Sequence, residues 1–160
     1  MLSESSLIDR LQTADLSTPF AYLGPIQEGD ETKIRAWLPG ADSVKLLSQE
    51  GDDSLGSFKR VKDSPLFELS LASNSLPKPY RFRVAYEDGE NLLVDPYQFK
   101  DDAFHAVHYL ATQADNIYQQ LGAQLITLPG GIQATRFAVF APNAKSCSVI
   151  GDFNHWDGRR

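Results

Sequence analysis

"TKIRAWLPGADSVKLL", residues 32–47, alternates apolar and polar side chains on either side of a Pro-Gly turn. Alternation with a period of two residues is typical of a β-strand that buries one face. The stretch therefore predicts two short strands joined by a tight turn. The apolar positions expected to face the core are Ile34, Ala36, Leu38, Val44 and Leu46.

Further alternating runs extend the β pattern from residue 18 to about residue 95. The clearest are "LFELSL" at 66–71 and "YRFRVAY" at 80–86, after which Asp88-Gly89 supplies a tight turn into "NLLV". Several short strands with no long helix between them favour an antiparallel sandwich. We predict an all-β fold, with an immunoglobulin-like antiparallel β-sandwich over residues 18–100.

Two segments do not follow the β pattern. Residues 1–17 form either a short amphipathic helix, with Leu7, Ile8 and Leu11 on one face, or a frayed tail. Residues 101–122 lack alternation and are predicted to be a linker with two short helical pieces, at about 101–111 and 115–121, the second ended by Gly122.

The opening pattern returns near the end of the chain. Thr32 aligns with Thr135 at an offset of 135 − 32 = 103 residues, which is about the length of one β-sandwich domain. Residues 123–160 are therefore predicted to be the start of a second sandwich, cut after about two strands and marginally stable on its own. We expect the chain to be a fragment of a longer protein. The repeated identities are Pro39, Ala41 and Ser43 with Pro142, Ala144 and Ser146, and the repeated apolar face is Phe137, Val139, Ala141, Cys147 and Val149.

Charge and composition limit the classes of partner that the chain is expected to bind. The chain has 15 basic and 21 acidic residues, a net charge of −6, and no basic stripe, so we expect no nucleic-acid partner. It has no apolar run near the roughly 20 residues that span a bilayer, and no secretory signal, so we expect no membrane association. The single Cys147 cannot form an internal disulfide, which fits a cytoplasmic location, and it is expected to be a small core residue.

"RFAVFAPNAKSCSVIGDFNHWDGRR", residues 136–160, resembles the opening of the isoamylase-type carbohydrate-binding module of bacterial 1,4-alpha-glucan (glycogen) branching enzymes. "TPFAYLGP" at 18–25 and "YRFRVAYEDGENLLVDPYQF" at 80–99 resemble the additional N-terminal sandwich of the same enzymes. The resemblance covers residues 18–160. The sequence departs from the family pattern at Pro25 and Gln124, where histidine is usual.

The resemblance implies an enzyme that cuts an α-1,4-glucan and rejoins the freed segment as an α-1,6 branch. In this family the catalytic carboxylates lie in a (β/α)₈ barrel that follows the second sandwich, so we expect no catalytic residue in these 160. We expect no cofactor and no metal, a monomer, and two partners: α-glucan and the catalytic barrel. Two alternatives stay open: a stand-alone glycan-binding or scaffolding module, and the N-terminal part of a debranching or trehalose-forming enzyme.

The candidate carbohydrate-binding residues are Trp156, Asn154 and Asp157. An exposed tryptophan offers a flat apolar face to a pyranose ring, and in the related kinase beta subunits the matching tryptophan contacts glycogen. The alternative is that this loop packs on the catalytic barrel. Phe153 is expected in the core.

Other conspicuous residues have structural interpretations. Trp37 lies on the face opposite Ile34, where it is either exposed or covered by a neighbouring domain. Asp95-Pro96-Tyr97 is interpreted as a strand end docked on the linker. His105 and His108 resemble half a metal site but have no third ligand of matching context, so we expect no zinc. Gly130-Gly131 is interpreted as a flexible joint.

Overall fold

The computed structural model describes residues 2–100, 121–145, 147–154, 156 and 158. The chain divides into two compact units, Ser17–Gln98 and a second that joins Met1–Leu16 to Phe99–Arg160. Each unit is described by itself below. Among the described residues, no helix is both long and apolar enough to cross a membrane.

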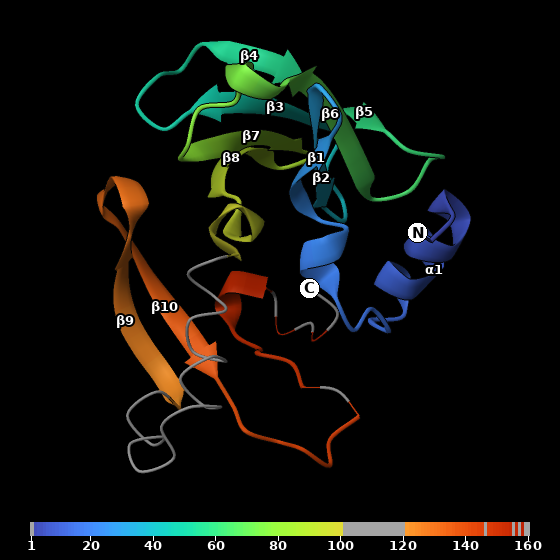
Figure 1. The fold of residues 1–160 in the computed structure, drawn as a ribbon, viewed down its shortest axis with the longest axis vertical. Coiled ribbons are helices and arrows are strands. Elements are labelled where there is room, and N and C mark those ends of the chain that lie inside the picture. The colour runs from blue at the N-terminus through green and yellow to red at the C-terminus, as the bar shows by residue number, and fades with distance from the viewer. Residues whose placement is uncertain (1, 101–120, 146, 155, 157, 159–160) are drawn as a thin grey trace. The chain divides into compact units, whose positions relative to one another are not determined.

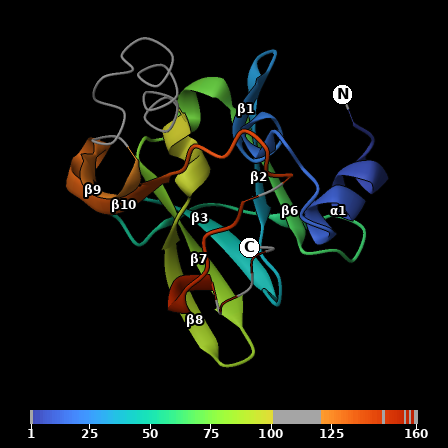
Figure 2. The ribbon, with the colours of Figure 1, turned by 90° about the horizontal axis from the view of Figure 1, so that it is seen from below.

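The first unit contains two four-stranded antiparallel sheets, which Figures 1 and 2 show as separate layers. The strand order is β1-β2-β6-β5 in one sheet and β4-β3-β7-β8 in the other. This arrangement confirms the predicted all-β antiparallel sandwich. The strands are β1 (Gly24–Glu28), β2 (Glu31–Trp37), β3 (Ser43–Ser48), β4 (Ser54–Ser57), β5 (Lys59–Arg60), β6 (Leu66–Ala72), β7 (Tyr80–Tyr86) and β8 (Gly89–Val94).

The stretch at residues 32–47 links the two layers, because β2 and β3 belong to different sheets. Its turn is closed by Ala41 N, which donates to Leu38 O at 3.2 Å, and Gly40 takes a φ of 78°. The predicted inward face is confirmed. The side chains that form the core are Ile34, Ala36, Ala41, Val44, Leu46, Phe58, Phe67, Tyr80, Phe82 and Val84.

Arg60 closes one end of this core. Its guanidinium lies 4.8 Å from the centroid of the Phe67 ring, and Nη2 donates to Ala41 O at 2.5 Å. A cation over an aromatic face combined with a charged hydrogen bond to a carbonyl holds β5 against the β2–β3 turn.

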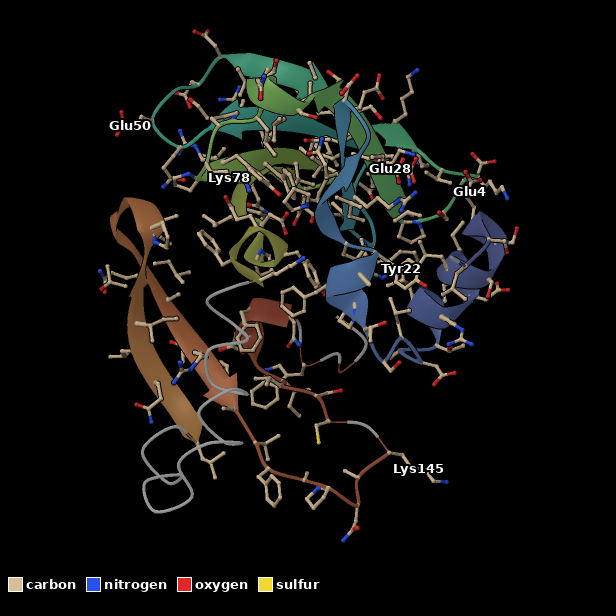
Figure 3. The ribbon with its side chains drawn as sticks, viewed as in Figure 1. Glu4, Tyr22, Glu28, Glu50, Lys78 and Lys145 are labelled. Atoms are coloured by element: carbon tan, nitrogen blue, oxygen red, sulfur yellow. The ribbon has the colours of Figure 1, made fainter. Side chains whose placement is uncertain are left out.

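On the polar outer face of the β1-β2-β6 layer, ion pairs connect neighbouring strands. The Glu28 carboxylate, labelled in Figure 3, lies 2.9 Å from Lys33 Nζ, and Arg35 Nε lies 2.5 Å from Glu68 Oε1. The pKa of Glu28 is lowered by its hydrogen bond with Lys33. Trp37, on the same face, is half-buried, so it is neither fully exposed nor fully covered.

The β7–β8 hairpin is confirmed with a small shift in its turn. Tyr86 pairs with Gly89, so the two turn residues are Glu87 and Asp88, and Gly89 begins β8.

The helical alternative for the N-terminus is confirmed by α1 (Glu4–Gln12). Ser3 Oγ accepts from Ser6 N at 3.3 Å, which caps the helix in the expected way. The predicted apolar face is buried at Leu7, Ile8 and Leu11.

The second unit contains a hairpin of β9 (Gly122–Leu128) and β10 (Ile132–Ala138). The β10 strand was expected, although it begins before Thr135, whereas β9 was not. Gly122 begins a strand, and the helix that it was predicted to end lies outside the described residues, so that part of the prediction is not tested. Gly130 and Gly131 form the hairpin turn, with φ angles of 78° and 73°. The predicted helical pieces at 101–111 and 115–121 lie outside the described residues, except for Leu121.

The repeated Pro-Asn turn has the same bond as its counterpart in the sandwich. Ala144 N donates to Ala141 O at 3.0 Å, and these positions are Ala41 and Leu38 shifted by 103 residues. The prediction of a strand after this turn is wrong for the described residues 147–150, which have no strand structure. A strand needs hydrogen-bonding neighbours, and β3 has β4 and β7 on its two sides.

The second copy keeps the apolar pattern but does not bury it. Phe137 is 50% exposed, Val139 is 67% exposed and Cys147 is exposed. The expectation that Cys147 is a core residue is therefore wrong in this chain.

Candidate carbohydrate-binding site

The loop at residues 151–156 is a tight turn closed on one carbonyl. Gly151 O accepts from Asn154 N at 3.1 Å and from Trp156 N at 2.9 Å. A short 3₁₀ turn, Asp152–Asn154, lies between them, and Trp156 takes a φ of 59°. These bonds bring the chain back on itself and direct the tryptophan outward.

The Asn154 side chain stabilises the loop through two hydrogen bonds to the backbone. Its side chain is buried, Oδ1 accepts from Gly151 N at 3.0 Å, and Nδ2 donates to Val149 O at 2.8 Å. An asparagine whose side chain bonds two backbone groups of the segment that leads into the turn fixes the shape of the loop. This geometry favours a positioning role for Asn154 over direct contact with a sugar.

Trp156 is the exposed aromatic that a sugar site requires. Its side chain is 64% exposed, and Nε1 donates to Asp152 Oδ1 at 2.8 Å. This bond fixes the polar edge of the indole and leaves an apolar ring face accessible to solvent. The role of Asp152 was missed in the sequence, where a carboxylate four residues before the tryptophan was the available signal.

Phe153 is 70% exposed, so the prediction that it lies in the core is wrong. Its ring lies over Gly151, where an added Cβ would meet Phe153 Cε1 at 2.6 Å. The loop therefore presents two exposed aromatic side chains, and the glycine makes room for one of them.

The remaining predicted residues are not tested by the geometry. Asp157, His105 and His108 lie outside the described residues. Within the part of the chain that is described, no three His, Cys, Asp or Glu side chains come together as metal ligands would.

A second polar cluster is buried in the first unit, around Asp95. Tyr80 Oη donates to Asp95 Oδ2 at 2.5 Å, and Tyr97 N donates to Oδ1 at 2.9 Å. Gln98 Nε2 donates to Tyr80 O at 2.8 Å, and Gln98 Oε1 accepts from Tyr80 N at 2.9 Å. These bonds tie the segment after β8 to the start of β7.

Burial has the largest effect on the pKa values of the side chains in this cluster. It raises the pKa of Asp95 to about 6, although the hydrogen bonds from Tyr80 and Tyr97 act in the opposite direction. Burial also raises the pKa values of Tyr80 and Tyr97.

Tyr97 also packs on the beginning of the sandwich. Its ring meets Phe20 edge-on with centroids 5.1 Å apart, and a Cβ added to Gly24 would lie 2.6 Å from Tyr97 Cβ. Asp95-Pro96-Tyr97 thus docks on its own sandwich. The predicted docking on the linker involves residues outside the described part of the chain.

Two family models match the chain. Residues 4–97 match "alpha-1,4-glucan branching enzyme GlgB, N-terminal domain", and residues 120–160 match "Carbohydrate-binding module 48 (Isoamylase N-terminal domain)". The first match includes the sandwich and the second includes the β9–β10 hairpin and the Trp156 loop.

Known proteins agree with these matches. The chain is 46% identical over 153 residues to the 1,4-alpha-glucan branching enzyme GlgB of Pseudoalteromonas atlantica, covering 93% of this chain and 21% of that protein. It is 42% identical over 149 residues to the GlgB of Rubrobacter xylanophilus, covering 91% of this chain and 20% of that protein.

Solved structures add little. A pullulanase variant from Paenibacillus barengoltzii, solved with maltotetraose, is 26% identical over 56% of this chain and 16% of that one. Its TM-score of 0.38 is too low to bear on fold or function.

The chain spans about a fifth of the length of the branching enzymes it matches. The match over residues 4–97 includes more than half of the chain, and the identities extend over nearly all of it. The chain belongs to the family of the N-terminal domain of the alpha-1,4-glucan branching enzyme GlgB.

Proposed function

We propose that the chain is the non-catalytic N-terminal portion of a 1,4-alpha-glucan branching enzyme, in which it positions α-glucan relative to the catalytic barrel. Family membership and the identity to branching enzymes along almost the whole chain support this proposal over a debranching or trehalose-forming enzyme. The barrel, not this region, supplies the acid/base and nucleophile carboxylates that glucan transfer requires.

Exposure of Trp156 on a braced loop is the observation that supports glucan contact. Burying about 100 Å² of indole and sugar surface at roughly 25 cal/mol/Å² gives about 2.5 kcal/mol. Before the entropy cost of association is subtracted, that sets a lower limit of about 10 mM on the dissociation constant of this contact alone. Such a site acts by raising the local concentration of a long glucan chain near the catalytic barrel.

Retardation of the chain in native gels that contain glycogen tests this proposal. We expect weak retardation of the wild type and none for Trp156→Ala. Leu55→Ala is the matched control, because Leu55 is also an exposed apolar side chain but lies on β4, and it should migrate like the wild type. If Trp156→Ala is retarded as much as the wild type, the loop does not contact glucan, and packing on the barrel becomes the preferred role.

The strand order supports the finer classification of the first sandwich as immunoglobulin-like. The sheets β1-β2-β6-β5 and β4-β3-β7-β8 correspond to A-B-E-D and C′-C-F-G of that fold. A cytoplasmic location is supported by the single cysteine, which leaves no internal disulfide to form.

A further inference from the structure

The outer face of the β4-β3-β7-β8 sheet carries three cationic side chains close together. Lys45 on β3 lies directly opposite Arg83 on β7, and Arg81 lies two residues away along β7, on the same face. Like charges directly opposite each other on neighbouring strands destabilise a sheet. A sequence that breaks such a local rule is expected to do so where the residues serve a function.

The two arginines converge on one carboxylate oxygen. Arg81 Nη2 and Arg83 Nη2 each lie 3.3 Å from Asp52 Oδ1, and the Asp52 side chain is 78% exposed. Glu90 is a more distant partner, with its Oε2 atom 4.0 Å from Arg83 Nε. Donors from two guanidinium groups therefore meet at a single point, and an exposed carboxylate lies at that point.

The loop between β3 and β4 holds Arg81 in place. Arg81 Nε donates to Ser48 O and Arg81 Nη2 donates to Gly51 O, both at 3.3 Å. Gly51 N in turn donates to Ser48 Oγ at 2.9 Å. Because these bonds involve the loop backbone, the guanidinium stays oriented when the Asp52 carboxylate leaves it. Donors that are already oriented lower the cost of binding a ligand.

This loop occupies the place of the Trp156 loop in the sequence repeat. Ser48 lies 151 − 48 = 103 residues before Gly151, and each of the two residues closes a turn. Ser48 Oγ accepts from Gly51 N at 2.9 Å. Gly151 O accepts from Asn154 N at 3.1 Å, and 154 − 51 = 103 as well. The equivalent loops differ in chemistry, because the second presents the exposed Trp156 and the first presents an exposed carboxylate beside two arginines.

We propose that Lys45, Arg81 and Arg83 form a binding site for a phosphate monoester, and that the Asp52 carboxylate competes with the ester for the two arginines. A phosphate group carries about −1.5 to −2 charges and three terminal oxygens, so it can accept from both guanidinium groups and from the ammonium group. With Asp52 displaced, the three cations and Glu90 sum to 3 − 1 = +2, which balances that charge.

Two exposed apolar side chains lie beside the cations. Leu92 pairs with Arg83 and Val94 pairs with Arg81, so they belong to the same face of the sheet. They are 52% and 38% exposed. These side chains offer an apolar contact to the carbon skeleton of an ester, which inorganic phosphate lacks. The inference goes beyond glucan contact at Trp156 and does not depend on it.

The test is a titration of the chain with inorganic phosphate and, separately, with glucose 6-phosphate, at constant ionic strength. Chemical shifts of the Nε–Hε groups of Arg81 and Arg83 report binding. We expect saturable shifts with both probes, and about threefold tighter binding of glucose 6-phosphate because of the apolar contact. Acetate, a monoanion with two oxygens, should bind at least about tenfold more weakly than phosphate.

Two variants remove charged donors. Arg83→Gln should weaken the binding of both probes at least about tenfold, and Lys45→Gln at least about threefold. Lys45 is exposed, so its variant tests the site even if Arg83→Gln does not fold. Lys59→Gln is the control for net charge, because Lys59 is an exposed cation on β5 of the other sheet. Its affinity should stay within about twofold of the wild type.

A matched pair of variants tests the competition. Asp52→Asn should tighten the binding of both probes at least about threefold, because it removes the competing carboxylate. Asp53→Asn removes the same charge from the next residue of the same loop, and Asp53 is also exposed. Both arginines bond Asp52, so Asp53→Asn should change the affinity less than about twofold.

Four results would overturn the proposal. One is the absence of a saturable shift with either probe, and a second is acetate binding as tight as that of phosphate. A third is an equal effect of the two loop variants, or of Lys59→Gln and Lys45→Gln, which would leave only net charge as the cause. The fourth is tighter binding of inorganic phosphate than of glucose 6-phosphate, which would identify the free anion as the ligand. Glucan is absent from every sample, so these results leave the proposal for Trp156 untouched.

Discussion

Asp95 should make the first sandwich less stable as the pH rises from about 4 to about 6. Its folded pKa is raised from 3.8 to about 6 by burial, so the folded state holds a proton that the unfolded state has already lost in this range. The contribution of this group is fully present below about pH 4 and is lost as the pH passes through 6. A rise of about two pKa units corresponds to about 3 kcal/mol.

Asp95→Asn isolates this effect, because the amide does not titrate. The free energy of unfolding of the wild type minus that of the variant should fall by about 3 kcal/mol between pH 4 and pH 7. Urea denaturation in a Trp156→Phe background measures it, since Trp37 is then the tryptophan that reports on the sandwich. Leu55→Ala is the control, because Leu55 is an exposed side chain without a titratable group and its removal should leave the pH dependence of the wild type unchanged.

Tyr80→Phe sharpens the test. Its hydroxyl donates to Asp95 and lowers the pKa of that carboxyl, so removing it should move the pH window upward. The reasoning would be refuted if the free energy of unfolding of the wild type minus that of Asp95→Asn stayed constant or rose with pH. It would mean that the two hydrogen bonds outweigh burial and that Asp95 is ionised throughout.

Three further predictions compare the two copies and the loop. Gly24→Ala should destabilise the sandwich by about 3 kcal/mol, because the new side chain is strained by the positive φ and collides with Tyr97. Gly29→Ala is the control: Gly29 has a φ of 64° but open space around it, so its substitution should cost about 1 kcal/mol. Urea denaturation measures both values. Ile34→Ala should cost about 2–5 kcal/mol and its half-exposed counterpart Phe137→Ala less than about 1 kcal/mol, measured the same way; equal costs would contradict the burial difference. Asn154→Ala removes both bonds that brace the loop, so the fluorescence anisotropy of Trp156 in a Trp37→Phe background should fall; an unchanged value would contradict the bracing role.

The sandwich was predictable because its strands bury one face. In β2 and β7 the apolar residues recur every second position, and these positions are the buried ones at Ile34 and Val84. The family was predictable from the motifs at residues 18–25, 80–99 and 136–160. Both depend on local sequence, which carries the pattern without knowledge of the partner strands.

The β9 strand was hidden by an ambiguity in its first residue. Glycine at positive φ ends many helices, and the same conformation begins β9 at Gly122. The following residues, "AQLITL", have apolar side chains on both faces, so the period does not separate helix from strand. The pairing with β10 decides the structure, and pairing is a non-local property.

The loop at residues 151–156 was identified from the sequence, but the roles of its residues were not all predicted. Trp156 was identified as the exposed aromatic, whereas Asp152, which orients it, and the exposure of Phe153 were not. Burial of an aromatic residue in a loop depends on which other elements cover it. The sequence likewise gave no sign that Asp95 is bonded to Tyr80, which lies 15 residues away.

The contact of Tyr97 with Phe20 and Gly24 brings the first and last segments of the first sandwich together. A domain whose two ends meet can be spliced into a polypeptide, or removed from it, without forcing the flanking segments apart. A domain of this kind is well suited to insertion and to tandem repetition.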